Sequence, residues 1–114
     1  MLIDEVLEEL RQFTKERDWG KFHSPENLAK GISIEAAELL ECFQWSSEYE
    51  KEDVRLELAD ILTYCYLLSD KLGEDPNSLV LEKLSITKKK YPIEQSKGIA
   101  TKYSKLRMLS SEEV

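Results

Sequence analysis

The sequence predicts an all-α fold, an antiparallel four-helix bundle or a close relative of one. Four segments repeat apolar residues at the three- and four-residue spacing of a helix that buries one face. No segment alternates apolar and polar residues with β-branched enrichment, so strands are not indicated. Only four glycines and three prolines interrupt the 114 residues. A chain of this length holds one modest core, and we expect a single domain over residues 1–114.

The first helix is predicted over residues 2 to about 17, because one apolar stripe runs through this segment. Its members are Ile3, Val6, Leu7, Leu10 and Phe13. The stretch 18–23 interrupts the pattern and predicts a loop before the next helix.

The second helix is predicted from Pro25 to about Trp45. Ser24 has the residue type of an N-cap, and proline is favoured at the first helical position. The residues expected to face inward are Leu28, Ile32, Ala36, Leu39, Leu40 and Phe43. A polar loop beginning at 46–47 follows.

The third helix is predicted over residues 50–72, with Gly73 ending it in a left-handed conformation. Its inward residues are Val54, Leu58, Ile61, Leu62, Cys65 and Leu68. Asp75 and Pro76 open a fourth helix, which ends near residues 90–92 and carries Leu79, Val80 and Leu84. Beyond it we expect an arm over about 93–114, within which 101–109 forms either a short last helix or an extended segment.

Composition excludes several classes of function. Acidic residues outnumber basic ones by 23 to 16, for a net charge of −7, which disfavours a nucleic-acid polymer as partner. No apolar run reaches the length of a membrane span, and the acidic N-terminus lacks the features of a secretory signal. Cys42 and Cys65 are isolated and lie in apolar stretches. We therefore expect reduced thiols, a cytoplasmic location and no membrane partner.

Two pairs of acidic residues carry the functional argument. Glu35 and Glu38 lie three residues apart in the second predicted helix, and Glu57 and Asp60 have the same spacing in the third. This spacing places both members of a pair on one face of a helix. Both pairs border the apolar stripe, where neighbouring helices meet, instead of the polar face.

Carboxylates that converge in this way need their negative charge neutralised. Two carboxylates about 5 Å apart repel by about 3 kcal/mol at an effective dielectric constant near 20. Either some of them are protonated at neutral pH, or a hard cation such as Mg²⁺ neutralises them. The alternative is that each pair is solvated surface, which is common in a chain with 23 acidic residues. Glu41 fits a surface acid better than a fifth ligand.

The single histidine excludes two other metal sites. Ferritin-like di-iron bundles need a Glu-x-x-His motif on two helices, and a HExxH zinc site needs two histidines on one helix. His23 is the only histidine in the chain, and it falls in the loop before the second helix.

The residues together resemble the MazG-like all-α nucleoside triphosphate pyrophosphohydrolases. The two acidic pairs match the metal-binding signature of that superfamily. Further segments resemble its dCTP pyrophosphatase branch: 16–19 (ERDW), 22–28 (FHSPENL), 35–45 (EAAELLECFQW), 57–64 (ELADILTY) and 83–92 (KLSITKKKYP). The resemblance spans about residues 1–106.

The resemblance implies an activity and an assembly. The implied reaction is Mg²⁺-dependent hydrolysis of a nucleoside triphosphate to a monophosphate and pyrophosphate, with Mn²⁺ as a possible substitute. The implied assembly is a homodimer or homotetramer of four-helix subunits, with active sites at subunit contacts. The substrate suggested first is a pyrimidine deoxynucleotide such as dCTP.

The resemblance also implies roles for individual residues. Glu35, Glu38, Glu57 and Asp60 correspond to the metal ligands. Glu35, or else Glu38, would orient or deprotonate the attacking water. The residues that match positions around the nucleotide are Trp19, His23, Trp45, Tyr64, Lys83, Thr87 and Tyr91. Thr87 is a departure, because the family usually has asparagine there, four residues after the lysine.

Structural roles remain open for these side chains. Trp19 and Trp45 are either core anchors or the rim of a base-binding pocket, and His23 is either a pocket residue or a partner for a backbone carbonyl. Tyr64 and Tyr91 serve packing as readily as ligand contact. For the whole chain, the alternative is a non-catalytic helical module that forms homo-oligomers or binds a nucleotide without turnover.

Overall fold

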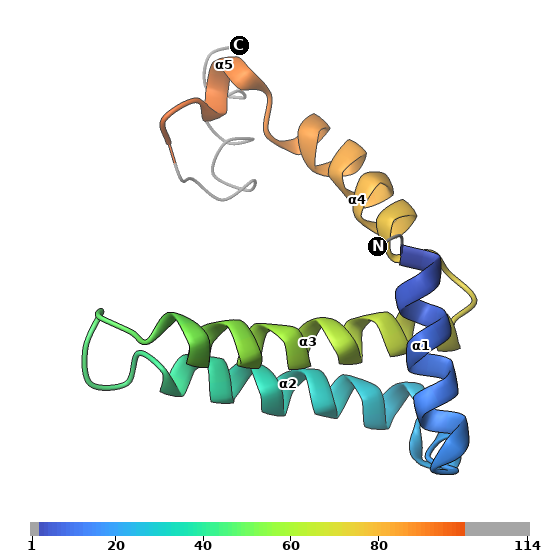
Figure 1. Ribbon diagram of the computed structural model, residues 1–114. Coiled ribbons are helices and arrows are strands. Elements are labelled where there is room, and N and C mark those ends of the chain that lie inside the picture. Colours follow the sequence, from blue (N-terminus) through green and yellow to red (C-terminus); the bar gives the residue numbers. More distant parts are fainter. Residues whose placement is uncertain (1–2, 100–114) are drawn as a thin grey trace. The chain divides into compact units, whose positions relative to one another are not determined.

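The computed structural model describes residues 3–99, and every regular element in this part of the chain is helical (Figure 1). The elements are α1 (Ile3–Glu16), the 3₁₀ turn η1 (Gly20–Phe22), α2 (Pro25–Glu41), α3 (Lys51–Lys71), α4 (Pro76–Lys90) and α5 (Ile93–Ser96). The predicted all-α class is confirmed. The chain divides into two compact units, Met1–Pro76 and Asn77–Val114. The single domain over 1–114 stays a prediction.

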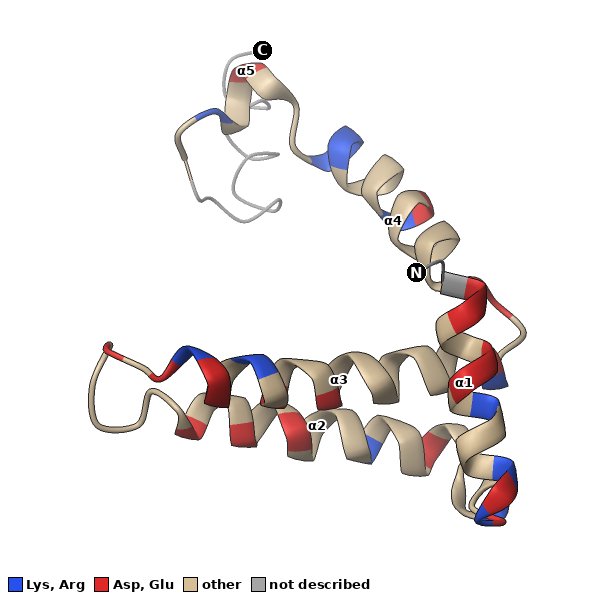
Figure 2. Ribbon diagram, viewed as in Figure 1, with Lys and Arg blue, Asp and Glu red and all other residues tan. Residues whose placement is uncertain are grey.

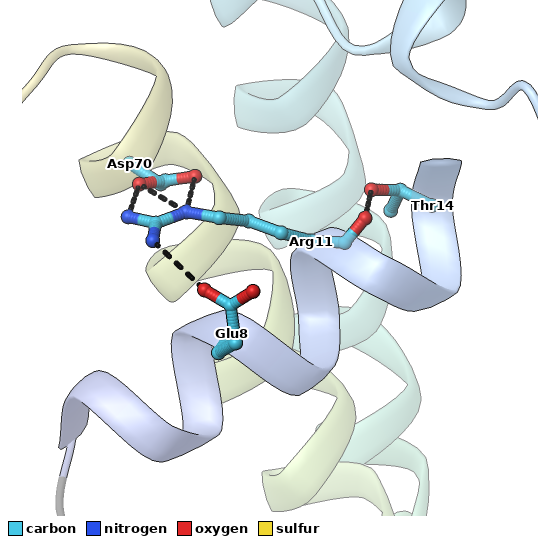
Figure 3. A network of polar contacts seen from close by, with 4 residues as sticks. All are labelled: Glu8, Arg11, Thr14 and Asp70. Carbon is cyan, nitrogen blue, oxygen red and sulfur yellow. Dashed lines mark hydrogen bonds and ion pairs between the residues drawn. The ribbon is translucent and has the colours of Figure 1, made fainter. Parts of the chain in front are cut away.

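The first unit is built around α2 and α3, which lie side by side and run antiparallel (Figure 1). Helix α1 packs against α3 near the end of this pair. The side chain of Arg11 on α1 joins Asp70 on α3 through two donor nitrogens; its Nε lies 3.0 Å from Oδ2 and 3.2 Å from Oδ1 (Figure 3). Two parallel N–H···O contacts fix direction as well as distance, so this pair helps to orient α1 on α3.

Helix ends follow the chemistry of the sequence at three points. The Ser24 side chain accepts a hydrogen bond from the Asn27 N–H at 3.1 Å, as expected for an N-cap. Gly73 has a φ of 72°, as predicted for the residue that ends α3. Asp18 takes the same left-handed conformation after α1, with a φ of 52°, and the Trp19 N–H then reaches back to the Thr14 carbonyl. This turn brings Trp19 beside the C-terminal end of α1.

Helix α2 ends at Glu41, so the predicted end near Trp45 is wrong. The N–H groups of Cys42, Phe43 and Gln44 each donate to the carbonyl three residues back, which tightens the chain into a turn. The Phe43 ring packs against Tyr49, with ring centroids 5.0 Å apart. The helix therefore ends before its apolar pattern does, and a ring contact spans the 42–50 connection that follows.

Several apolar residues predicted to face inward are exposed. Leu7 and Leu28 are buried, whereas Leu40 is 71% exposed and Leu58 and Leu62 are each 45% exposed. Ala36 is also exposed, as are Val80 and Leu84 on α4. Two packed helices cover one strip of each other, so the wider apolar faces of α2 and α3 need a further surface to cover them.

Charge is distributed unevenly along the described residues. Acidic residues lie along α2 and α3, whereas the last turn of α4 carries Lys88, Lys89 and Lys90 (Figure 2). Cys42 and Cys65 are half-buried free thiols. Among the described residues, no helix is both long and apolar enough to cross a membrane. The segment 101–109 lies outside the described residues.

Candidate active site

Three of the predicted metal ligands converge where α2 faces α3. One carboxylate oxygen from each of Glu35, Glu57 and Asp60 lies within 4.8 Å of the other two. Glu38, the fourth predicted ligand, lies close enough to Glu35 and Glu57 to raise the pKa of both. The helical spacing seen in the sequence thus brings two pairs from antiparallel helices into one acidic cluster, which we call the carboxylate cluster.

The carboxylate cluster holds protons more tightly than free acids do. Burial, hydrogen bonding to Glu38 and repulsion from the other acids raise the pKa of Glu35 from 4.5 to about 7. The same causes raise the pKa of Glu57. With a pKa of about 7, Glu35 is protonated in about half of the molecules at pH 7, so near neutral pH the cluster without a cation carries less than its full charge.

These residues fit a hard divalent cation. The Oε2 atoms of Glu35 and Glu57 are buried and have no hydrogen-bond partner. A buried oxygen without a partner is costly, and a cation satisfies it. The donors are all carboxylate oxygens, which suit Mg²⁺ or Mn²⁺ and offer nothing to metals that prefer sulfur or nitrogen.

A pocket of about 350 Å³ adjoins the cluster. Glu35 and Asp60 line it, so the carboxylate cluster opens directly onto the pocket. The other lining residues come from α1, the following loop and α3: Leu10, Phe13, Thr14, Trp19, His23, Thr63, Tyr64 and Leu67. The arrangement places a charged end and an aromatic end in one cavity.

Trp19 and His23 belong to the rim of this pocket. Trp19 is 44% exposed and packs edge-on against Phe13, with ring centroids 5.3 Å apart. The Arg17 guanidinium covers the Phe13 ring at 3.9 Å. His23 lines the pocket with its side chain, while its backbone N–H donates to the Gly20 carbonyl. Of the two interpretations left open for Trp19, these contacts favour the pocket rim over a core anchor.

The remaining predicted nucleotide-binding residues are not among those that line this pocket. Trp45 is 89% exposed in the 42–50 connection and does not line the pocket. Lys83, Thr87 and Tyr91 belong to the second unit, where the Thr87 hydroxyl donates to the Lys83 carbonyl and the Tyr91 N–H donates to the Thr87 carbonyl. Their four-residue spacing puts Lys83 and Thr87 on one side of α4, and Tyr91 directly follows the end of the helix.

Sequence reasoning missed part of the pocket wall. Leu10 and Phe13 were assigned to the core stripe of the first helix, and Thr14, Thr63 and Leu67 received no role. The sequence signal for Phe13 was its place at the C-terminal end of the stripe, shortly before Trp19 in the chain. No sequence pattern singles out the two threonines, because only the packing of α1 on α3 brings them together.

Comparison with known proteins decides the family. Residues 30–106 match the MazG-like family, and this stretch includes both acidic pairs. The chain belongs to the MazG-like family. The predicted resemblance is therefore confirmed.

Curated relatives and a solved structure agree with this assignment. The chain is 36% identical to dCTP pyrophosphatase 1 of Mus musculus and 32% identical to that of Homo sapiens, in each case over 89% of this chain and 68% of the relative. A crystal structure of a pyrophosphatase from Archaeoglobus fulgidus is 41% identical and superposes with a TM-score of 0.74, covering 78% of this chain and 91% of the other. The MazG-like chain thus shares both sequence and fold with proteins named as pyrophosphatases.

Proposed function

We propose that this MazG-like chain hydrolyses a nucleoside triphosphate to a monophosphate and pyrophosphate with the help of Mg²⁺. One observation carries the proposal: a carboxylate cluster with buried, unpartnered oxygens opens onto a pocket with an aromatic rim. The cluster suits the metal-bound phosphate end of such a substrate, and the rim suits a base. Family membership and the named relatives make the chain a nucleoside triphosphate pyrophosphohydrolase.

Glu35, Glu38, Glu57 and Asp60 would hold the metal. Mg²⁺ bound there neutralises negative charge on the phosphoryl groups and makes water more acidic. Because Glu35 both belongs to the cluster and lines the pocket, it is our candidate for activating the water that attacks the α-phosphorus. Glu38, whose carboxylate raises the pKa of Glu35, is the alternative.

The nucleoside would occupy the aromatic end. Trp19 and His23 would stack or bond the base, and Tyr64 would lie beside the sugar. Stacking of a base on an aromatic side chain is worth about 1–3 kcal/mol in single-strand binders. The relatives' name makes dCTP the first substrate to test. Lys83 is proposed to contact the phosphates, and Trp45, Thr87 and Tyr91 are proposed to complete the nucleotide contacts.

We also propose that the chain forms a homodimer or homotetramer. Exposed apolar side chains on α2 and α3 support this assembly: Ile34 is 59% exposed, Leu40 71% and Leu56 58%. A second copy would cover these faces and would help to enclose a pocket that lies at the surface of one chain. Light scattering on a sizing column should give a mass of two or four times 13.3 kDa. A clean monomer would contradict the proposal. The cytoplasmic location stays a prediction.

The deciding experiment measures product and metal dependence together. Purified protein is incubated with dCTP and a panel of other (d)NTPs, with Mg²⁺ or with excess chelator. We expect monophosphate and pyrophosphate in equal amounts, and only with the metal. Stepwise release of single phosphates would overturn the proposal. Metal-dependent nucleotide binding without turnover would instead favour a non-catalytic nucleotide-binding module.

A further inference from the structure

Gly31 on α2 and Tyr64 on α3 form a contact one helical turn from the carboxylate cluster. Gly31 precedes Glu35 by four residues, and Tyr64 follows Asp60 by four. In an antiparallel pair of helices, one step of four residues along each chain leads from one facing pair to the next. The Gly31–Tyr64 contact is therefore the neighbour of the Glu35–Asp60 pair, on the side toward the pocket.

The tyrosine ring occupies the space where a side chain at position 31 would lie. A Cβ atom added to Gly31 would be 2.6 Å from Cε1 and 2.7 Å from Cδ1 of Tyr64. Any residue other than glycine would force the ring to move, because carbon atoms pack at about 3.5–4.0 Å. Glycine also weakens the interior of a helix relative to alanine. Gly31 is half-buried, and a close approach of the ring accounts for a glycine at this point of α2.

The position of this ring affects the pocket. Tyr64 lines the cavity of about 350 Å³ together with Glu35 and Asp60. A ring that lies against the backbone of α2 leaves space between the carboxylates and the Phe13–Trp19 rim. A ring displaced from α2 would change the shape of this cavity, because Tyr64 lines it. Gly31 is not among the lining residues, so its influence on the pocket would be exerted through the Tyr64 ring.

We propose that Gly31 is a specificity-determining residue that acts through Tyr64. By letting the ring lie back against α2, Gly31 provides room for the sugar and base of the nucleotide next to the metal-binding carboxylates. The inference rests on the proposed function, since it assigns the pocket to the nucleoside part of the substrate. Gly31 itself touches no substrate, so it is a positioning residue.

The test replaces Gly31→Ala and separates binding from turnover. We expect the KM for dCTP to rise about 10-fold, because the displaced ring narrows the pocket, and kcat to change by less than about 3-fold, because the carboxylate cluster lies a turn away. Ser33→Ala is the matched control. Ser33 is exposed on the same helix, so its replacement improves helix propensity in the same direction and should leave both constants unchanged.

A purely structural glycine would behave differently. Alanine at a mid-helix position with free space raises the melting temperature and leaves KM unaltered, and that combination in Gly31→Ala would overturn the inference. Tyr64→Leu provides a second check. Once the ring is gone, adding Gly31→Ala should change KM by less than about 2-fold; an undiminished 10-fold effect would show that Gly31 does not act through Tyr64.

NMR tests the contact between Gly31 and Tyr64 in the absence of substrate. In the NMR spectrum of the wild-type chain, the Gly31 Hα resonances should be shifted upfield by the Tyr64 ring, and Tyr64→Leu should abolish the shift. Unshifted resonances in the wild-type chain would contradict the contact. Turnover of dCTP by the wild-type chain with no effect of Gly31→Ala would refute this inference and leave the proposed function standing. Absence of pyrophosphate release by the wild-type chain would refute the proposed function.

Discussion

Acidification should weaken Mg²⁺ binding by the chain, and Glu35 should account for most of the effect. A metal ion needs the ionised carboxylate, whereas the raised pKa of about 7 keeps a proton on Glu35 over much of the neutral range. The direction of the pH dependence follows from this pKa. Above about pH 7 the group is ionised and ready to bind, and each step below that value makes the ion compete with a proton.

The magnitude comes from the titration of a single group. With a pKa of about 7, Glu35 is ionised in about 90% of molecules at about pH 8 and in about 3% at about pH 5.5. The dissociation constant of Mg²⁺ should therefore rise by about 30-fold between these two pH values. The pKa of Glu57 is raised as well, so protonation of Glu57 adds to the effect in the same direction.

Isothermal titration calorimetry with Mg²⁺ alone measures this effect. Two buffers with different ionisation enthalpies report the protons released, which we expect to be about 0.5 per ion from Glu35 at about pH 7. Glu35→Gln should bind more weakly at about pH 8 and show a flatter pH dependence. Glu26→Gln, an exposed acid on the same helix, should behave like the wild-type chain. A dissociation constant that stays within about 3-fold over the whole range, with no proton release, would refute the reasoning.

Four further predictions concern turnover and stability. Asp60→Asn should abolish pyrophosphate release while the circular dichroism spectrum stays helical; retained full activity would mean that Asp60 holds no metal. Asp70→Asn should lower the melting temperature near neutral pH by removing the contact with Arg11, and its difference from the wild-type chain should shrink on acidification. Because folding lowers the pKa of Asp70, its ionised carboxylate stabilises the folded chain. This contribution is fully present above about pH 3.8 and is lost as the pH falls through the pKa of Asp70 in the folded chain. Leu28→Ala should cost about 2–5 kcal/mol in urea unfolding, because Leu28 is 1% exposed. Leu40→Ala, at a side chain that is 71% exposed, should cost less than about 0.5 kcal/mol in a monomer; a larger cost that grows with protein concentration would place Leu40 in an oligomer interface.

Local signals predicted most of the helices and the core of the candidate site. Ser24 caps α2 and Gly73 ends α3 as expected, because N-cap hydrogen bonds and left-handed C-terminal turns depend on neighbouring residues. The acidic pairs converge because spacing within each helix fixes a face. The end of α2 was predicted wrongly, because the chain tightens into a turn after Glu41 and Phe43 packs on Tyr49 instead of continuing the apolar face of the helix.

By itself, the sequence determined the helical class, the family and the identity of the acids that form the cluster. Each of these depends on residue type and on spacing over a few turns, which a helix converts directly into position. The tertiary structure alone decided how α1 seats on α3 through Arg11 and Asp70, and how Tyr64 comes to rest on Gly31. Those contacts join residues 33 to 59 positions apart. No local rule links such residues, because their approach depends on the packing of whole helices.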